Sequence, residues 1–168
     1  MRKELIVEKL EKIFYECDKH LLRIEQASDN LKSTMPLNEK KYLNLADEKV
    51  QALDQFLFRF AKLQDAMGQK LFKNILLYLG ESIEGKPFID ILNLMEKLYL
   101  IDNITAWREL REDRNELAHN YEDELEIMSA TINNLYNKKG ILKDIYLKIK
   151  EFYQAREKLD KVMLSIAK

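Results

Sequence analysis

The chain has few of the residues that punctuate strands and hairpins, with four glycines and two prolines among 168 residues. Sheet proteins of this size need turn residues at regular short intervals, and such a pattern is missing here. Aliphatic and aromatic residues make up 46% of the chain, and charged residues make up 34%. These values favour an all-α protein, and the length fits a single domain covering residues 1–168.

Cysteine and histidine are also scarce. Cys17 is the single cysteine and there are two histidines, so the chain cannot form an internal disulfide and has no recognisable zinc-binding spacing. We therefore expect no metal site, and we interpret Cys17 as a small core residue. Glycine-rich phosphate loops are missing too, which excludes nucleotide-binding enzymes of the P-loop and dinucleotide-binding types. No cofactor is expected.

Long apolar runs and a strong charge of one sign are the remaining absences. No stretch approaches transmembrane length, and the N-terminus enters an amphipathic pattern directly instead of a signal-peptide core. We expect a soluble, cytoplasmic protein that does not associate with membranes. The formal net charge is −1, so the chain as a whole does not attract a polyanion. If RNA is the substrate, local cationic residues must bind it.

Apolar residues recur at helical spacing along most of the chain. Gly68 is predicted as a joint within the second helical region, Gly80 as its C-terminal cap, and Gly140 as an interruption between the last two helices. Asp102 and Asn103 offer a predicted N-cap for the helix that follows them. The predicted helices cover approximately residues 3–31, 39–79, 88–99, 103–118, 124–136 and 142–166. Together they predict an antiparallel bundle of five or six helices.

One short segment, residues 107–121, concentrates side chains with chemical reactivity. It contains three arginines and one of the two histidines, namely Arg108, Arg111, Arg114 and His119. An arginine and a histidine together suit metal-independent cleavage of RNA, in which the 2′-hydroxyl attacks the neighbouring phosphate. Imidazole, with an unperturbed pKa of about 6.5, transfers the proton, and the planar guanidinium binds the phosphoryl oxygens as charge develops.

Helical spacing determines which of these side chains meet. Leu110 and Leu117 define the buried side of the predicted helix, so His119 points away from the core. Arg114 precedes His119 by five residues, and on a regular helix the two side chains diverge by about 140°. A shared site therefore requires either that the helix ends before His119 or that a second copy of the chain contributes its own segment across a two-fold axis.

A purely structural interpretation of the segment is also open. In that interpretation, Arg111 and Arg114 pair with carboxylates of their own helix, and His119 interacts with the helix dipole. The protein is then a helical interaction module. The carboxylates within reach on the same helix are those of Glu112, Asp113 and Glu116.

The pattern Arg114-x4-His119-x-Tyr121, in an all-helical chain of this length, resembles the motif of the HepT toxins of the HEPN superfamily. Residues 52–67 are similar, more loosely, to the long second helix of this group. The resemblance implies a HEPN-like fold and a two-fold homodimer whose interface holds an RNase site. It implies that Arg114 stabilises the phosphate, that His119 acts as acid and base, and that Asn115 is a supporting polar group.

The resemblance also implies a protein partner. In HepT-like toxins, a cognate minimal nucleotidyltransferase antitoxin attaches AMP to the tyrosine that Tyr121 matches here, and added negative charge beside His119 would repel RNA. Arg108 and Arg111 are candidate contacts to the RNA. The expected function is therefore a metal-independent endoribonuclease, the toxin of a toxin-antitoxin pair. The alternative is a non-catalytic substrate-binding subunit or partner of a small nucleotidyltransferase.

Overall fold

The computed structural model describes residues 2–119 and 123–168, and this part of the chain contains helices and no strands. In chain order the elements are α1 (Lys3–Leu31), α2 (Glu39–Leu43), α3 (Asp47–Ala66), the π-helical turn η1 (Met67–Leu71), α4 (Phe72–Tyr78), α5 (Phe88–Lys97), α6 (Ile104–Ala118) and α7 (Leu125–Ile166). Because α3, η1 and α4 follow one another without a gap, they form one long helix. The predicted all-α bundle is confirmed.

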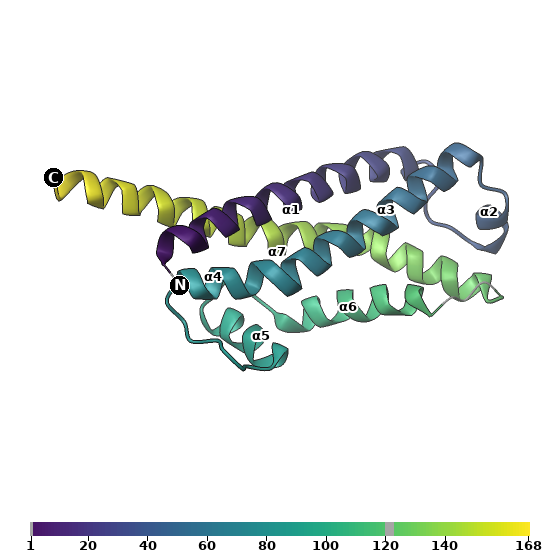
Figure 1. The fold of residues 1–168 in the computed structure, drawn as a ribbon. Coiled ribbons are helices and arrows are strands. Elements are labelled where there is room, and N and C mark those ends of the chain that lie inside the picture. The colour runs from purple at the N-terminus through teal and green to yellow at the C-terminus, as the bar shows by residue number, and fades with distance from the viewer. Residues whose placement is uncertain (1, 120–122) are drawn as a thin grey trace.

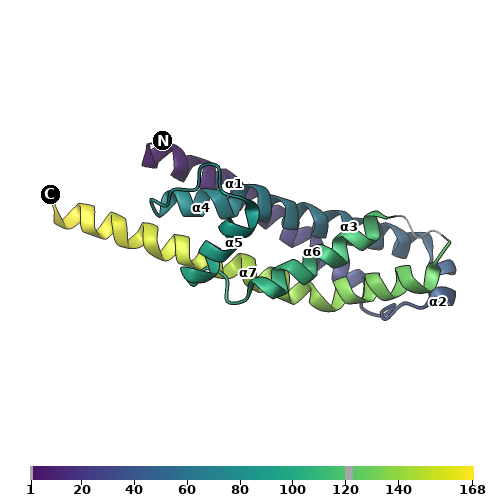
Figure 2. The ribbon, with the colours of Figure 1, turned by 90° about the horizontal axis from the view of Figure 1, so that it is seen from below.

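Four long helical segments run up and down the bundle (Figure 1). α1 is antiparallel to the combined α3, η1 and α4, and α6 is antiparallel to α7. α2 lies in the connection at one end, and α5 lies at the opposite end. Seen from below, α6 and α7 lie along each other, and the C-terminal part of α7 extends beyond the other helices (Figure 2). None of the described helices combines the length and the apolar character needed to cross a membrane.

The inner faces of the helices share one apolar core. α1 contributes residues at the predicted three- and four-residue spacing, and Cys17 among them is fully buried. Burial raises the pKa of the Cys17 thiol to about 12, so the thiol stays protonated at neutral pH. This confirms Cys17 as a core residue. The largest buried side chains are those of Trp107, Tyr146, Phe56, Phe60 and Phe72.

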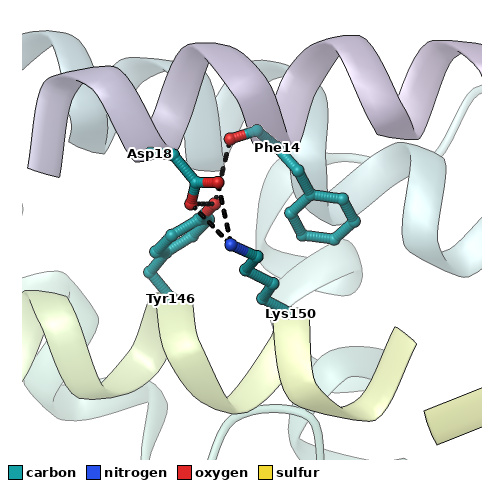
Figure 3. A network of polar contacts seen from close by, with 4 residues as sticks. All are labelled: Phe14, Asp18, Tyr146 and Lys150. Carbon is teal, nitrogen blue, oxygen red and sulfur yellow. Dashed lines mark hydrogen bonds and ion pairs between the residues drawn. The ribbon is translucent and has the colours of Figure 1, made fainter. Parts of the chain in front are cut away.

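A polar cluster joins α1 to α7 at the edge of this core (Figure 3). The Tyr146 hydroxyl lies 2.6 Å from Asp18 Oδ1 and 3.1 Å from the carbonyl oxygen of Phe14. Lys150 Nζ donates to both oxygens of the Asp18 carboxylate, at 2.8 and 2.9 Å. Burial and the hydrogen bond to Asp18 raise the pKa of Tyr146, which therefore stays neutral. The cluster pairs the buried hydroxyl and sets the register of α7 against α1.

The predicted interruption at Gly140 is wrong, because α7 continues through this residue from Leu125 to Ile166. Glycine inside a helix costs about 1 kcal/mol relative to alanine, which is too little to break a helix that is held by packing on both sides. Leu135, Leu142 and Tyr146 on either side of Gly140 are buried and supply that packing. Local propensity is therefore overridden by tertiary contacts.

The prediction of a second helical region over residues 39–79 is nearly right. Gly80 follows α4 with a φ of +83°, as expected for a C-terminal glycine cap. Gly68 lies in η1, which continues the helix with a local change of hydrogen bonding. A Cβ atom at Gly68 would lie 3.1 Å from Trp107 Cζ2 on α6, so glycine permits a close approach here. The unpredicted feature is a break between Leu43 and Asp47, which separates α2 from α3.

Substitution of two helical glycines by alanine is expected to have opposite effects. Gly140→Ala should raise the free energy of unfolding by about 0.5–1 kcal/mol, because alanine favours the helix and the new Cβ would meet nothing within 4 Å. Gly68→Ala should lower it, because the new Cβ would press on Trp107. Urea unfolding followed by far-UV circular dichroism measures both. A stabilised Gly68→Ala would contradict the close approach of α6.

Candidate functional site

The candidate motif lies at the C-terminal end of α6. Asn103 caps the start of this helix, and its side chain accepts a hydrogen bond from the Thr105 amide at 2.8 Å, as predicted. Ala118 is the last helical residue, and the His119 amide donates to the Glu116 carbonyl oxygen at 3.2 Å. The helix therefore ends before His119, which is one of the two arrangements that the spacing requires for a shared site.

The sides of α6 are as the spacing predicts. Leu110 is fully buried and Leu117 packs against the core, whereas Arg108, Asn115 and His119 are exposed. His119 thus points away from the core of its own chain. An imidazole in this position is accessible to a substrate or to a second protein chain.

Arg114 is held by a carboxylate of another helix. Its Nη2 atom donates to Asp65 Oδ2 on α3 at 3.0 Å, and its Nη1 atom donates to Asn115 Oδ1 at 3.4 Å. The side chains of Arg114 and Asp65 are 32% and 35% exposed. A guanidinium has five N–H donors, so several remain after these two contacts. The ion pair therefore orients a partly exposed cation that still has donors for an anionic oxygen.

The carboxylates of α6 itself bind elsewhere. Asp113 accepts a hydrogen bond from Lys138 Nζ on α7 at 2.7 Å, and Glu116 accepts one from the Thr131 hydroxyl at 3.3 Å. The interpretation in which Arg114 pairs with carboxylates of its own helix is therefore wrong. α6 is tied to α7 by its acids and to α3 by Arg114.

The other predicted site residues are placed as follows. The Arg111 guanidinium lies 5.2 Å from the ring centroid of Phe88 on α5, a cation–π contact. Arg108 is exposed. Tyr121, the predicted site of AMP attachment, lies outside the described residues.

The structure thus brings Arg114 and Asn115 together with Asp65, and it leaves His119 beyond the end of the helix. Asp65 could not be inferred as part of the site, because it precedes Arg114 by 49 residues and no spacing rule relates the two. Its one signal was its position in the segment that resembles the long second helix of the HepT group. Within residues 2–119 and 123–168, no group of three or more His, Cys, Asp and Glu side chains could hold a metal ion.

The second histidine belongs to a separate polar cluster between α1 and α3. His20 is 8% exposed, and its Nδ1 atom lies 3.0 Å from Arg59 Nη1. Its Nε2 atom lies 3.6 Å from Glu16, which also pairs with Lys70 at 3.0 Å. Burial and the charge of Arg59 lower the pKa of His20, so a neutral imidazole accepts the hydrogen bond from Arg59. His20 is therefore a packed histidine between α1 and α3.

The comparisons with known proteins identify no relative of this chain. No protein-family model, curated protein or solved structure matches the chain. The case for a function therefore rests on the motif, on the position of Arg114 and His119, and on the charges around them.

Proposed function

We propose that the chain is a metal-independent endoribonuclease whose site forms around Arg114 and His119 at the interface of a homodimer. In this proposal it is the toxin of a HEPN and minimal-nucleotidyltransferase toxin-antitoxin pair. The observation that carries the proposal is the Arg114 guanidinium, oriented by Asp65 and partly exposed, on the helix that ends just before an exposed His119. An oriented cation and an accessible imidazole are the two groups that such cleavage requires.

The reaction proceeds by transfer of the phosphoryl group to the 2′-oxygen of the same nucleotide. The 2′-oxygen attacks phosphorus while the bond from phosphorus to the 5′-oxygen breaks. A base accepts the 2′-hydroxyl proton, and an acid donates a proton to the departing 5′-oxygen. The products are a 2′,3′-cyclic phosphate and a 5′-hydroxyl end. Arg114 binds the non-bridging oxygens as negative charge develops on them.

A dimer supplies what one chain lacks at this site. The base and the acid act on opposite sides of the phosphate, and each chain contributes one histidine, His119, at the end of α6. A two-fold axis passing beside this end would place one His119 near the 2′-oxygen and the other near the 5′-oxygen. The exposure of His119 is compatible with such an arrangement.

The proposed partner is a minimal nucleotidyltransferase that attaches AMP to Tyr121. This residue follows His119 by two positions. The attached group would add bulk and negative charge next to the imidazole, and both would exclude an RNA phosphate. Modification of Tyr121 would therefore switch the proposed activity off.

His119→Ala is expected to lower the rate of RNA cleavage by at least about 100-fold, because it removes both the base and the acid. Wild-type protein should cut single-stranded RNA in the presence of a metal chelator. Gel electrophoresis of end-labelled RNA measures the rate, and mass spectrometry identifies the cyclic phosphate. Lys158→Ala, which changes an exposed residue near the far end of α7, is the matched control.

Two outcomes would contradict the proposal. Equal cleavage by the wild type and by His119→Ala would show that the activity does not belong to this site. Tight binding to a nucleotidyltransferase without any cleavage by the free protein would favour the alternative, a non-catalytic binding subunit. Light scattering after size-exclusion chromatography tests the dimer independently of activity.

A further inference from the structure

Helix α3 exposes an aromatic ring between two cations. The Phe58 side chain is 55% exposed. Arg59 Cζ lies 5.7 Å from the centroid of this ring, and Lys62 Nζ lies 5.5 Å from it. An exposed aromatic ring and two cations in contact with it are the two kinds of group that bind single-stranded nucleic acids, by stacking on a base and by attraction of phosphates.

The same side of α3 leads to α6. Residues 58, 62 and 65 are separated by four and three positions, so they lie along one side of the helix. Asp65 on this side binds Arg114. Gly68 follows Asp65 by about one helical turn. A Cβ atom added at Gly68 would lie 3.7 Å from the ring of Phe88. Arg111 from α6 lies over that ring.

These cationic and aromatic side chains, on α3 and on the helices beside it, are hereafter the α3 strip. Its members are Phe58, Arg59, Lys62, Phe88, Arg111 and Arg114. Asp65, the carboxylate that lies within the strip, is neutralised by Arg114. Asp54, one turn before Phe58, lies at its end. The strip therefore has more positive than negative charge, although the net charge of the chain is −1.

Several lysines of α7 are paired with carboxylates of α1 and α6. On α7, Lys138 binds Asp113, Lys143 binds Glu25 and Lys150 binds Asp18. Asp18 and Glu25 of α1 and Asp113 of α6 are thus directed at α7. Arg59 and Lys62 on α3 lie instead against the exposed ring of Phe58, where a polyanion could reach them.

Two arginines of the strip are held in position before any ligand binds. The neutral His20 accepts a hydrogen bond from Arg59 at 3.0 Å, and Asp65 accepts one from Arg114 at 3.0 Å. Residues 59 and 65 are about 9 Å apart along the axis of α3, from the rise per residue. Holding a guanidinium in place reduces the entropy lost when it binds a phosphate.

We infer that the α3 strip binds single-stranded RNA, with a base stacked on Phe58 and the phosphates along Arg59, Lys62 and Arg111. The strand then reaches Arg114, so the inference deepens the proposed function and rests on it. Single strands are favoured because an exposed ring can stack only on an unpaired base, whereas the bases of a duplex already stack on one another.

The test measures binding to the His119→Ala protein, in which the RNA is not consumed. Fluorescence anisotropy follows a labelled oligoadenosine strand. Adding Phe58→Ala is expected to weaken binding roughly ten-fold through loss of stacking. Adding Lys62→Ala should weaken it several-fold and reduce the dependence of log K on log salt by about 0.7, the value for one phosphate contact on a single strand.

Matched controls come from the same chain. Tyr15→Ala removes an exposed aromatic residue of α1, and Lys158→Ala removes an exposed lysine near the end of α7. Both should bind the oligonucleotide as tightly as the parent protein. A duplex of the same length should be insensitive to Phe58→Ala. Circular dichroism checks that all variants fold. We expect them to fold, because the side chains of Phe58 and Lys62 are exposed.

The outcomes separate this inference from the proposed function. Unchanged binding by both strip variants, or no binding by the parent, overturns the inference. A change of oligomeric state in Phe58→Ala with unchanged RNA binding also overturns it, and identifies the strip as a contact between copies. Binding that depends on Phe58 and Lys62, without cleavage by the wild type, supports the strip and refutes the nuclease. Cleavage by the wild type, with a KM that is unchanged when Phe58→Ala or Lys62→Ala is made in the wild type, supports the nuclease and refutes the strip.

Discussion

Arg114→Ala is expected to lower the rate of RNA cleavage by at least about 100-fold, the effect of removing a preorganised donor to a developing oxyanion. The same substitution should cost little stability. The two side chains of the ion pair with Asp65 are about one-third exposed, and pairs of this kind contribute on the order of 0–1 kcal/mol. A large loss of activity with a small loss of stability would distinguish a catalytic arginine from a structural one. Single-turnover cleavage and urea unfolding measure the two quantities.

Two further variants make this prediction more specific. Arg114→Lys keeps the charge but loses the planar fork of donors, so its cleavage rate should lie between those of the wild type and Arg114→Ala. Asp65→Asn keeps the shape of the partner and removes its charge, so the guanidinium is positioned less firmly and the rate should fall by less than in Arg114→Ala. Wild-type rates in Arg114→Ala would show that the pair with Asp65 only joins α6 to α3.

Trp107→Ala is expected to lower the free energy of unfolding by about 3–5 kcal/mol, the range for truncation of a large buried aromatic side chain. Trp107 is 1% exposed, and its ring packs edge-on against Phe72 at a centroid distance of 4.7 Å. It also lies against Gly68. The side chain thus fills the space between α6 and the long helix, and its removal leaves a cavity. Far-UV circular dichroism in urea measures the loss.

Trp107→Phe is the matched control for this cavity. Trp107 Nε1 has no hydrogen-bond partner in the described part of the chain, so phenylalanine loses volume but no hydrogen bond. Its cost should be clearly smaller than that of Trp107→Ala. Trp107 lies seven residues before Arg114 on the same side of α6, so loss of this packing should also weaken the pair with Asp65. A loss below about 1 kcal/mol in Trp107→Ala would contradict this account of the core.

Prediction from sequence succeeded where the structure depends on neighbouring residues along the chain. The bounds of α1, the cap at Asn103 and the end of α6 at Ala118 agree with the structure. These features depend on local hydrogen bonds and on which side of a helix is apolar. The prediction failed at Gly140, where packing on both sides of the glycine outweighs its low helix propensity.

The candidate site was only partly predictable. The exposure of His119 follows from spacing and from the position of Leu110 and Leu117, whereas the end of the helix before His119 was one of two arrangements that the spacing left open. The pairs of Arg114 with Asp65 and of Arg59 with His20 do not. Periodicity shows which side of a helix is buried, but it does not show which neighbouring helix will face that side.

The sequence by itself determined that this protein is helical, where α1 and α6 begin and end, and that Arg114 and His119 cannot meet along one regular helix. Only the tertiary structure decided which charges remain available. The near-neutral composition argues against a polyanion partner, yet packing places Arg59 and Lys62 of α3 beside the exposed ring of Phe58. Charge balance is a property of the whole chain, whereas binding depends on which side chains packing brings together.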